Sequence, residues 1–401
     1  MTRLRLSAPL TVLVLGTLIS TLGDGVAMLA MVLDAASRGP TWWVTEVYFA
    51  EMIPPLLLAP LLGVFVDRTD AKRLWLLAVL AQAVLFTVAA LTPDFHIRVV
   101  LIALANVFAV VSSSASFKLL PSVAGETGVE KANSVLSTVM SVAALAGPAA
   151  GGTLFGLVGS SWLLGFNGVT FVLVSLIVWL VVPAGSDKRM SLSTNPFQGG
   201  LEGLQAMWRS PVLGPLLPIL AAVVFATSIE GVAGVFYLRE VTDSNALYGL
   251  LLSAWALGSI PGSLIGSWRR LSGRHLFMVV GGAFLVSIAL LVEGLVPVAL
   301  VIGVAFLIGG FGNGMHNVGV RNVIHHHIPS EMHGRAWAYF RVLVNACLAL
   351  GYLAGTPGIL LEARTAILGS GLLSLVTTLG AIWWFVARSS ARSTVEVYKG
   401  V

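Results

Sequence analysis

Long apolar stretches that recur along the whole chain constrain this sequence more than any other feature. About twelve of them, each roughly 20–27 residues long, are separated by short polar connectors. Because a helix rises 1.5 Å per residue, each stretch can cross about 30 Å of hydrocarbon. The chain is 57% hydrophobic, more than a water-soluble domain could bury. We therefore predict membrane spans at about 9–33, 41–66, 73–92, 97–120, 132–157, 161–183, 212–237, 246–268, 274–293, 297–320, 334–360 and 365–387.

The basic residues indicate how these spans are oriented. Most of the 23 Lys and Arg residues fall in connectors that share one side of the membrane if both termini are cytoplasmic. The opposite connectors hold only Arg38, Arg98, Arg239 and Arg364, while Arg341 lies inside a span. Such a bias is typical of cytoplasmic loops. We expect a multi-pass protein of the inner (plasma) membrane with contacts to lipid, and no nucleic-acid partner despite the net charge of +5.

The longest connector divides the chain in two. It predicts an N-terminal six-helix bundle at 1–183, a cytoplasmic linker at 184–211 and a C-terminal six-helix bundle at 212–401. Within the linker, Phe197, Leu201, Leu204 and Trp208 recur at helical spacing, which predicts an amphipathic helix on the inner leaflet.

The two halves look like copies of one unit. Asp24-Gly25-Val26-Ala27 recurs as Glu230-Gly231-Val232-Ala233, and Asp34 is matched by Glu240 at the same spacing. Nearly constant offsets at equivalent places indicate a parallel duplication. The predicted fold is therefore an all-α membrane protein with twelve transmembrane helices in two six-helix bundles.

The connector at 63–73 reads Gly-Val-Phe-Val-Asp-Arg-Thr-Asp-Ala-Lys-Arg, and places five charges between two apolar spans. Gly63 permits close helix approach, and Asp67 could accept backbone N–H groups at the start of span eleven, near Gly334. The basic residues could pair with acids or lipid phosphates. A topology signal alone would not need Asp67. We therefore expect a cytoplasmic gate built from Gly63, Asp67, Arg68, Lys72, Arg73, Gly334 and Arg335.

Acidic residues inside the spans are the best candidates for chemistry. A lone charge near the centre of a membrane helix costs about 2.5–3.5 kcal/mol, so such residues are seldom incidental. Asp24 and Glu230 lie at similar heights in spans one and seven, and Glu51 lies near mid-depth in span two. Glu46 is close to the outer surface, where solvation accounts for it.

Four stretches resemble the major facilitator superfamily, and nearest its drug:proton antiporter branch with macrolide-efflux-like proteins. They are the loop 63–73, Ser20–Asp24, the run Gly147-Pro148-Ala149-Ala150-Gly151-Gly152, and Pro329–Arg335. The resemblance covers essentially the whole chain. It implies two bundles around a central cavity, lined by spans one and seven, that opens alternately to each side of the membrane.

This resemblance implies roles for the buried acids. A carboxyl group in a partly apolar cavity can bind and release protons near neutral pH, or attract a cationic compound. We therefore expect Asp24, Glu51 and Glu230 to serve in proton coupling or substrate binding. The alternative is a structural ion pair with Arg321 or Arg341.

The span-five run resembles the antiporter motif of exporters, with Gly147, Pro148, Gly151 and Gly152 as its residues. Glycine and proline leave a smooth, kinkable helix surface, which suits either a leak-proof contact or ordinary packing. Polar residues in other spans, among them Asn313, His316 and Asn317, could line a cavity or join helices equally well.

Other chemistries find little support. His325–His327 are adjacent, so in a helix they would not converge on one metal ion, and we expect none. We find no phosphate-cradling loop and no catalytic cluster, and therefore expect neither an enzyme nor a cofactor. Cys347 is the only cysteine.

The function we expect is secondary active transport: proton-coupled export of a small hydrophobic or cationic compound by a monomer. Uptake or uniport of a nutrient or siderophore-like metabolite stays open. So does a membrane receptor or enzyme without transport.

Overall fold

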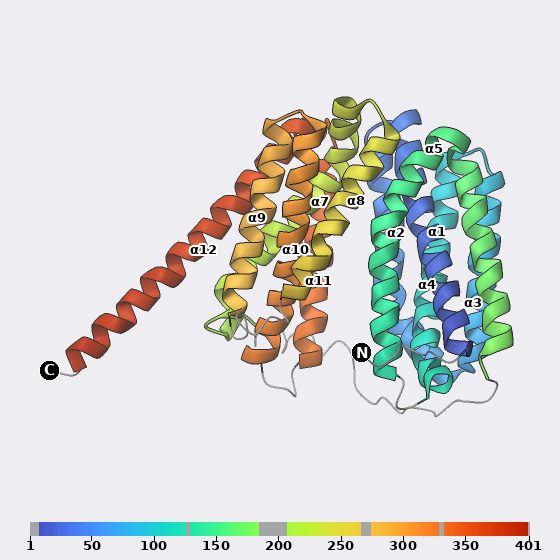
Figure 1. Ribbon diagram of the computed structural model, residues 1–401, viewed down its shortest axis with the longest axis horizontal. Coiled ribbons are helices and arrows are strands. Elements are labelled where there is room, and N and C mark those ends of the chain that lie inside the picture. The colour runs from blue at the N-terminus through green and yellow to red at the C-terminus, as the bar shows by residue number, and fades with distance from the viewer. Residues whose placement is uncertain (1–7, 126–128, 184–206, 266–273, 329–332, 400–401) are drawn as a thin grey trace. The chain divides into compact units, whose positions relative to one another are not determined.

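A computed structural model describes residues 8–125, 129–183, 207–265, 274–328 and 333–399, and these residues form helices throughout (Figure 1). Eleven helical elements are present in these ranges, of which α5 is two helices joined at a kink. Their bounds are α1 (Ala8–Arg38), α2 (Trp42–Arg68), α3 (Ala71–Leu91), α4 (Phe95–Ala124), α5 (Val129–Val181), α7 (Leu213–Thr242), α8 (Asn245–Leu264), α9 (His275–Leu295), α10 (Ala299–His327), α11 (His333–Gly355) and α12 (Ala363–Lys399).

The kink in α5 lies at Gly159, whose φ of 75° is a conformation that only glycine adopts readily. It separates the predicted spans at 132–157 and 161–183, so α5 counts as two helices and the total is twelve. Nine helices in the described part of the chain are long and apolar enough to cross a membrane. The predicted class, an all-helical membrane protein of twelve helices, is confirmed.

The chain divides into two compact units. The first unit comprises Met1–Thr194 with Thr242–Ser253, and the second comprises Asn195–Val241 with Ala254–Val401. The start of α8 thus belongs to the first unit. The predicted linker falls largely outside the described residues, as does most of its amphipathic helix. The linker and the bundle boundaries that it sets therefore stay predictions.

Small residues bring α1 and α5 together in the first unit. A Cβ on Gly147 would lie 3.2 Å from the Gly25 Cα, and one on Gly151 would lie 3.2 Å from the Leu29 Cβ. On the neighbouring face of α5, a Cβ on Gly152 would lie 3.1 Å from the Gly249 Cα at the start of α8. The glycines of the span-five motif therefore allow backbones to meet directly, as small residues do in membrane helices.

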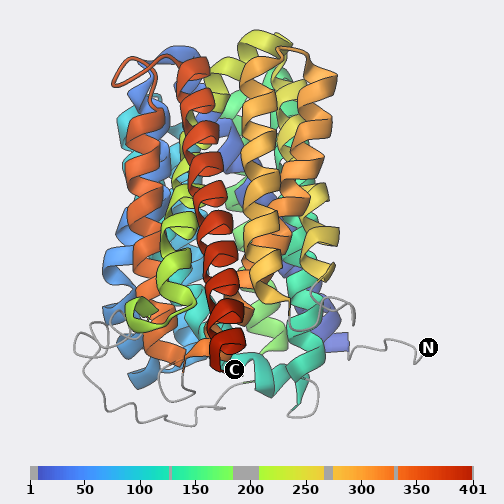
Figure 2. The ribbon, with the colours of Figure 1, turned by 90° about the vertical axis from the view of Figure 1, so that its left-hand side faces the viewer.

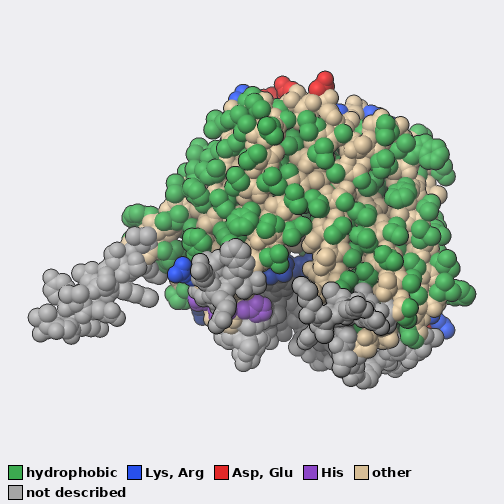
Figure 3. Space-filling view, viewed as in Figure 1, with side chains coloured by type: hydrophobic (Ala, Val, Ile, Leu, Met, Phe, Trp, Pro, Cys, Tyr) green, Lys and Arg blue, Asp and Glu red, His purple; other side chains and the backbone are tan. Residues whose placement is uncertain are grey.

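The second unit packs α9 against both α10 and α12, and these helices lie side by side in Figure 2. Its core is a cluster of buried aliphatic side chains from α7, α9 and α10. Ser287 and Ser374 add a buried hydrogen bond of 2.7 Å between α9 and α12. On the face shown in Figure 3, hydrophobic side chains cover the middle of the helices and charged ones gather toward their ends, as lipid contact requires.

Candidate functional site

The Asp24 side chain lines a cavity of about 470 Å³ in the first unit. Thr17, Ser20, Thr21 and Asp24 recur at three- and four-residue spacing, so they share one face of α1 and line the cavity together. The hydroxyls of Thr17 and Thr21 bond to carbonyls of their own helix. Their hydrogen bonding is therefore satisfied within α1, and the acid is the charged group of this face.

Asn167 on α5 holds the Asp24 carboxylate. Its Nδ2 donates to Asp24 Oδ1 at 3.0 Å, while Thr170 Oγ1 lies 3.1 Å from Asn167 Oδ1 and donates toward it. Asn167 is fully buried, so this orientation is enforced by its surroundings. A Cβ on Gly23 would lie only 2.3 Å from Asn167 Oδ1, so Gly23 is what allows the amide to reach the acid.

Helix α2 carries two further acids, Glu46 and Glu51. Glu51 interacts electrostatically with Asp24, but it is exposed and is not among the residues that line the cavity, so its role stays a prediction. Glu46 instead accepts from His96 Nδ1 at 3.0 Å, beside the stacked ring of Trp42. Glu46 therefore has a partner at the end of the helix and no place in the cavity.

The second unit holds a pair of acids, only one of which the sequence reading identified. Glu230 folds along α7, since a Cβ on Gly234 would lie 2.6 Å from its Oε1. Glu293 on α9 is fully buried, and neither of its carboxyl oxygens has a hydrogen-bond partner among the described residues. The two side chains interact electrostatically. Glu293 was missed because it ends a predicted span, although its apolar neighbours were a usable signal.

Among the described residues of the second unit, Glu230 and Arg341 form no ion pair with each other. The alternative of an ion pair with Arg321 stays open, and the role of Glu230 in coupling or binding stays a prediction.

Arg98 is buried, although the sequence placed it in an outer connector. It lies in the first turn of α4, with 4% of its surface exposed. It donates to Ser160 at 2.9 Å and Ser161 at 2.7 Å, and it pairs with Asp34 at 3.5 Å. Asp34 also pairs with Arg38. This network joins α1, α4 and α5 and serves the fold rather than the cavity.

The basic residues after α2 have local partners. Lys72 Nζ donates to the carbonyl of Trp179 at 3.1 Å and also to that of Val182, at the end of α5. Arg73 pairs with Asp70, whose carboxylate caps α3 by accepting from the Arg73 amide at 3.0 Å. These contacts hold the connector to its own bundle.

The rest of the predicted gate cannot be placed in this way. The side chains of Asp67, Arg68 and Arg335 lie outside the described part of the chain, as does the surrounding of Gly63 and Gly334. The latch between Asp67 and the start of α11 stays a prediction.

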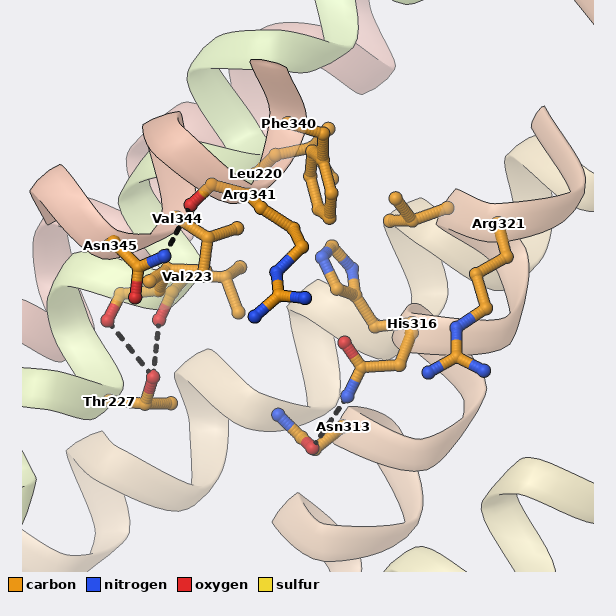
Figure 4. Close-up of a pocket in the computed structure, with 13 residues that line it drawn as sticks. Leu220, Val223, Thr227, Asn313, His316, Arg321, Phe340, Arg341, Val344 and Asn345 are labelled. Carbon is orange, nitrogen blue, oxygen red and sulfur yellow. Dashed lines mark hydrogen bonds between the residues drawn. The ribbon is translucent and has the colours of Figure 1, made fainter. Parts of the chain in front are cut away.

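A second cavity, of about 370 Å³, lies in the second unit among α7, α10 and α11 (Figure 4). Asn313, His316 and Asn317 line it, together with Arg321 and Arg341. The sequence left open whether these three polar residues line a cavity or join helices. All three line the cavity, and Asn317 also donates to Asn313 at 3.0 Å.

Among the described residues, no group of three His, Cys, Asp or Glu side chains could hold a metal ion. His326 and His327 donate from Nδ1 to carbonyls of their own helix.

Twelve helices in two units, with a cavity lined by polar and apolar side chains in each unit, are the architecture of a multi-pass membrane transport protein. Comparison with known families makes this specific. The sequence profile of the Major Facilitator Superfamily matches residues 13–352, and the chain belongs to that family, whose members are transporters and not enzymes.

Individual relatives are distant. The chain is 25% identical to "Multidrug efflux pump Tap" of Mycolicibacterium fortuitum over 375 residues, 89% of each chain. It is also 25% identical to "Putative bacilysin exporter BacE" of Bacillus amyloliquefaciens over 355 residues, 84% of this chain and 86% of the other. Among solved structures, a mutant of the nucleoside transporter NupG has a TM-score of 0.75 at 14% identity, covering 94% of this chain and 99% of its own. The last likeness shows the fold alone.

Proposed function

We propose that this secondary transporter exports a small hydrophobic or cationic compound from the cytoplasm in exchange for protons. The observation that carries the proposal is the Asp24 carboxylate, which lines a largely apolar cavity and has an amide rather than an arginine as its hydrogen-bond partner. A fixed arginine would hold such a carboxylate permanently charged, whereas an amide leaves it free to exchange a proton or a cation.

The neighbouring carboxyl group supports an exchangeable proton. Asp24 and Glu51 interact electrostatically, and two like charges repel each other. A proton bound to either one relieves that repulsion. When the cavity opens outward, proton binding to Asp24 removes the charge that faces the cavity and releases a cationic compound. When it opens inward, loss of the proton restores the binding charge.

The direction of transport draws support from the relatives, because two of them carry the names of an efflux pump and an exporter. At about 25% identity these names suggest export and leave the compound unnamed. Substrate-triggered collapse of a preset pH gradient in proteoliposomes measures the direction independently. Proton movement in the same direction as the substrate would establish uptake instead.

The test uses everted vesicles and a compound chosen by growth protection of an efflux-deficient host. Asp24→Asn should abolish proton-coupled accumulation, because the amide does not ionise and so cannot bind and release a proton in the transport cycle. Asp243→Asn is the matched control, since Asp243 is exposed and its φ of 48° suits asparagine equally well. Undiminished coupled transport by the Asp24 variant would remove this residue from the mechanism.

A further inference from the structure

We propose that the cavity of the second unit binds an anionic group of the transported compound, a carboxylate or a group of like charge, through Arg341. The inference deepens the proposed function, on which it rests for naming the occupant as substrate. It narrows the proposed substrate to a hydrophobic or cationic compound that also carries an anionic group, because a purely cationic compound would be repelled from this cavity.

The position of Arg341 within the helix is the first argument. It lies eight residues after the start of α11, about 12 Å along the helix at 1.5 Å per residue. Connectors account for basic residues that set topology, but Arg341 lies within the 23-residue helix α11 and not in a connector. Intramembrane arginines face cavities or partners, since an unsolvated guanidinium is costly.

The lack of a neutralising partner is the second argument. Among the described residues, no ion pair includes Arg341 and no Asp or Glu lines its cavity. Figure 4 shows its guanidinium directed into the cavity, with Asn313 and Arg321 across from it. The cavity therefore concentrates positive charge and amide groups, the set that a carboxylate recognises.

The surrounding contacts fix this arrangement. Asn345, one turn further along α11, donates to the Arg341 carbonyl at 2.8 Å and so stays on the same face. His316 donates from Nδ1 to the Val279 carbonyl at 2.8 Å, which holds its ring as a wall of the cavity. A volume of about 370 Å³ is in the range of small-molecule sites.

The experiment compares two probes that differ only in charge, dansylglycine and its neutral amide, dansylglycinamide. Their affinities are measured by fluorescence on the full chain in phosphatidylcholine nanodiscs, with no gradient applied. We expect dansylglycine to bind about tenfold or more tightly than the amide, because charge-assisted bonds to a guanidinium supply such a difference. In R341Q the ratio should fall to about one, with little change for the amide.

The control is R209Q, which removes the same charge from an exposed residue of the second unit outside the cavity. It should keep the wild-type ratio. Equal binding of both probes to the wild type, retention of the ratio in R341Q, or no binding of either probe would overturn the proposal. Since Arg341 is exposed, the glutamine variant should fold, and R321Q provides a second variant of the same cavity.

Lipid is the other source of an anionic headgroup. Repeating the measurement with added phosphatidylglycerol separates the two, because loss of dansylglycine binding would identify a lipid as the occupant and overturn the assignment to substrate. The binding ratio does not depend on protons or on Asp24. A failure of the D24N transport test would therefore leave this result intact, and the reverse also holds.

Discussion

Replacement of Asn167 by leucine should change the proton affinity of Asp24. The substitution keeps a similar volume but removes the amide that donates to the carboxylate at 3.0 Å. A hydrogen bond to a charged group contributes about 1.5–3 kcal/mol. One pH unit corresponds to about 1.36 kcal/mol. Loss of this bond destabilises only the ionised form, so the midpoint of Asp24 protonation should rise by roughly one to two pH units.

The midpoint can be measured without knowing the substrate. Infrared difference spectroscopy of the purified protein follows the carbonyl stretch of a protonated carboxyl group as pH is varied, and the band that Asp24→Asn abolishes belongs to this residue. Thr170→Val is the graded control, because it frees the Asn167 oxygen but leaves the donor in place. Its shift should be smaller than that of the leucine variant.

The refuting results are specific. If Asn167→Leu leaves the midpoint unchanged, the hydrogen bond does not stabilise the ionised carboxylate and the amide serves only packing. A lower midpoint would mean that Asn167 favours the neutral acid, which contradicts the proposed cycle. Thr170 should remain satisfied in the leucine variant, since its hydroxyl also lies 2.8 Å from the backbone carbonyl of residue 167.

Three further substitutions test the same structure. Gly23→Ala should raise the Asp24 midpoint as Asn167→Leu does, because the new Cβ would lie 2.3 Å from Asn167 Oδ1 and 3.0 Å from Thr170 Oγ1 and would push the amide away from the acid; an unchanged midpoint would contradict this. Arg98→Met should cost about 3–5 kcal/mol in detergent unfolding by breaking a buried ion pair, against less than about 1 kcal/mol for Arg38→Gln, whose side chain is 47% exposed; equal losses would refute the difference. Glu293→Leu should be at least as stable as the wild type, since it removes an unpartnered buried carboxyl, yet lose proton-coupled transport; normal transport would exclude Glu293 from coupling.

The helices could be read from the sequence because bilayer thickness imposes their length and hydropathy. Their ends could not, because tertiary partners decide them. Arg98 looks like a connector residue until Ser160 and Ser161 of α5 are seen around it. Gly159 likewise cannot be told apart in the sequence from the other glycines of the spans, whereas its φ of 75° places it at the junction of two helices.

The acidic residues of the candidate site could be predicted, because their residue type alone is unusual inside an apolar span. Asp24 and Glu230 stand out because a charge inside an apolar span is expensive. Asn167 does not stand out, since an amide in such a span can make many kinds of hydrogen bond. Its role depends on the hydrogen bond to Asp24, which the absence of a side chain at Gly23 permits. The cavity around Arg341 was equally hidden, because α7, which forms it together with α10 and α11, is distant from them in the sequence.

Duplication of the acids does not mean duplication of their roles. Asp34 and Glu240 occupy equivalent places in the two halves, yet Asp34 is buried and neutralised by Arg98, whereas Glu240 is exposed and needs no partner. In the second unit the buried acid is Glu293 instead, next to Glu230 and without a hydrogen-bond partner among the described residues. A carboxyl group in that position must be neutralised by something that binds, and in an apolar surrounding a proton is the simplest candidate. We therefore infer that Asp34 of the first unit is neutralised permanently by Arg98, whereas Glu293 of the second unit is neutralised by a proton that can exchange. For this reason the Glu293 substitution should separate proton coupling from stability.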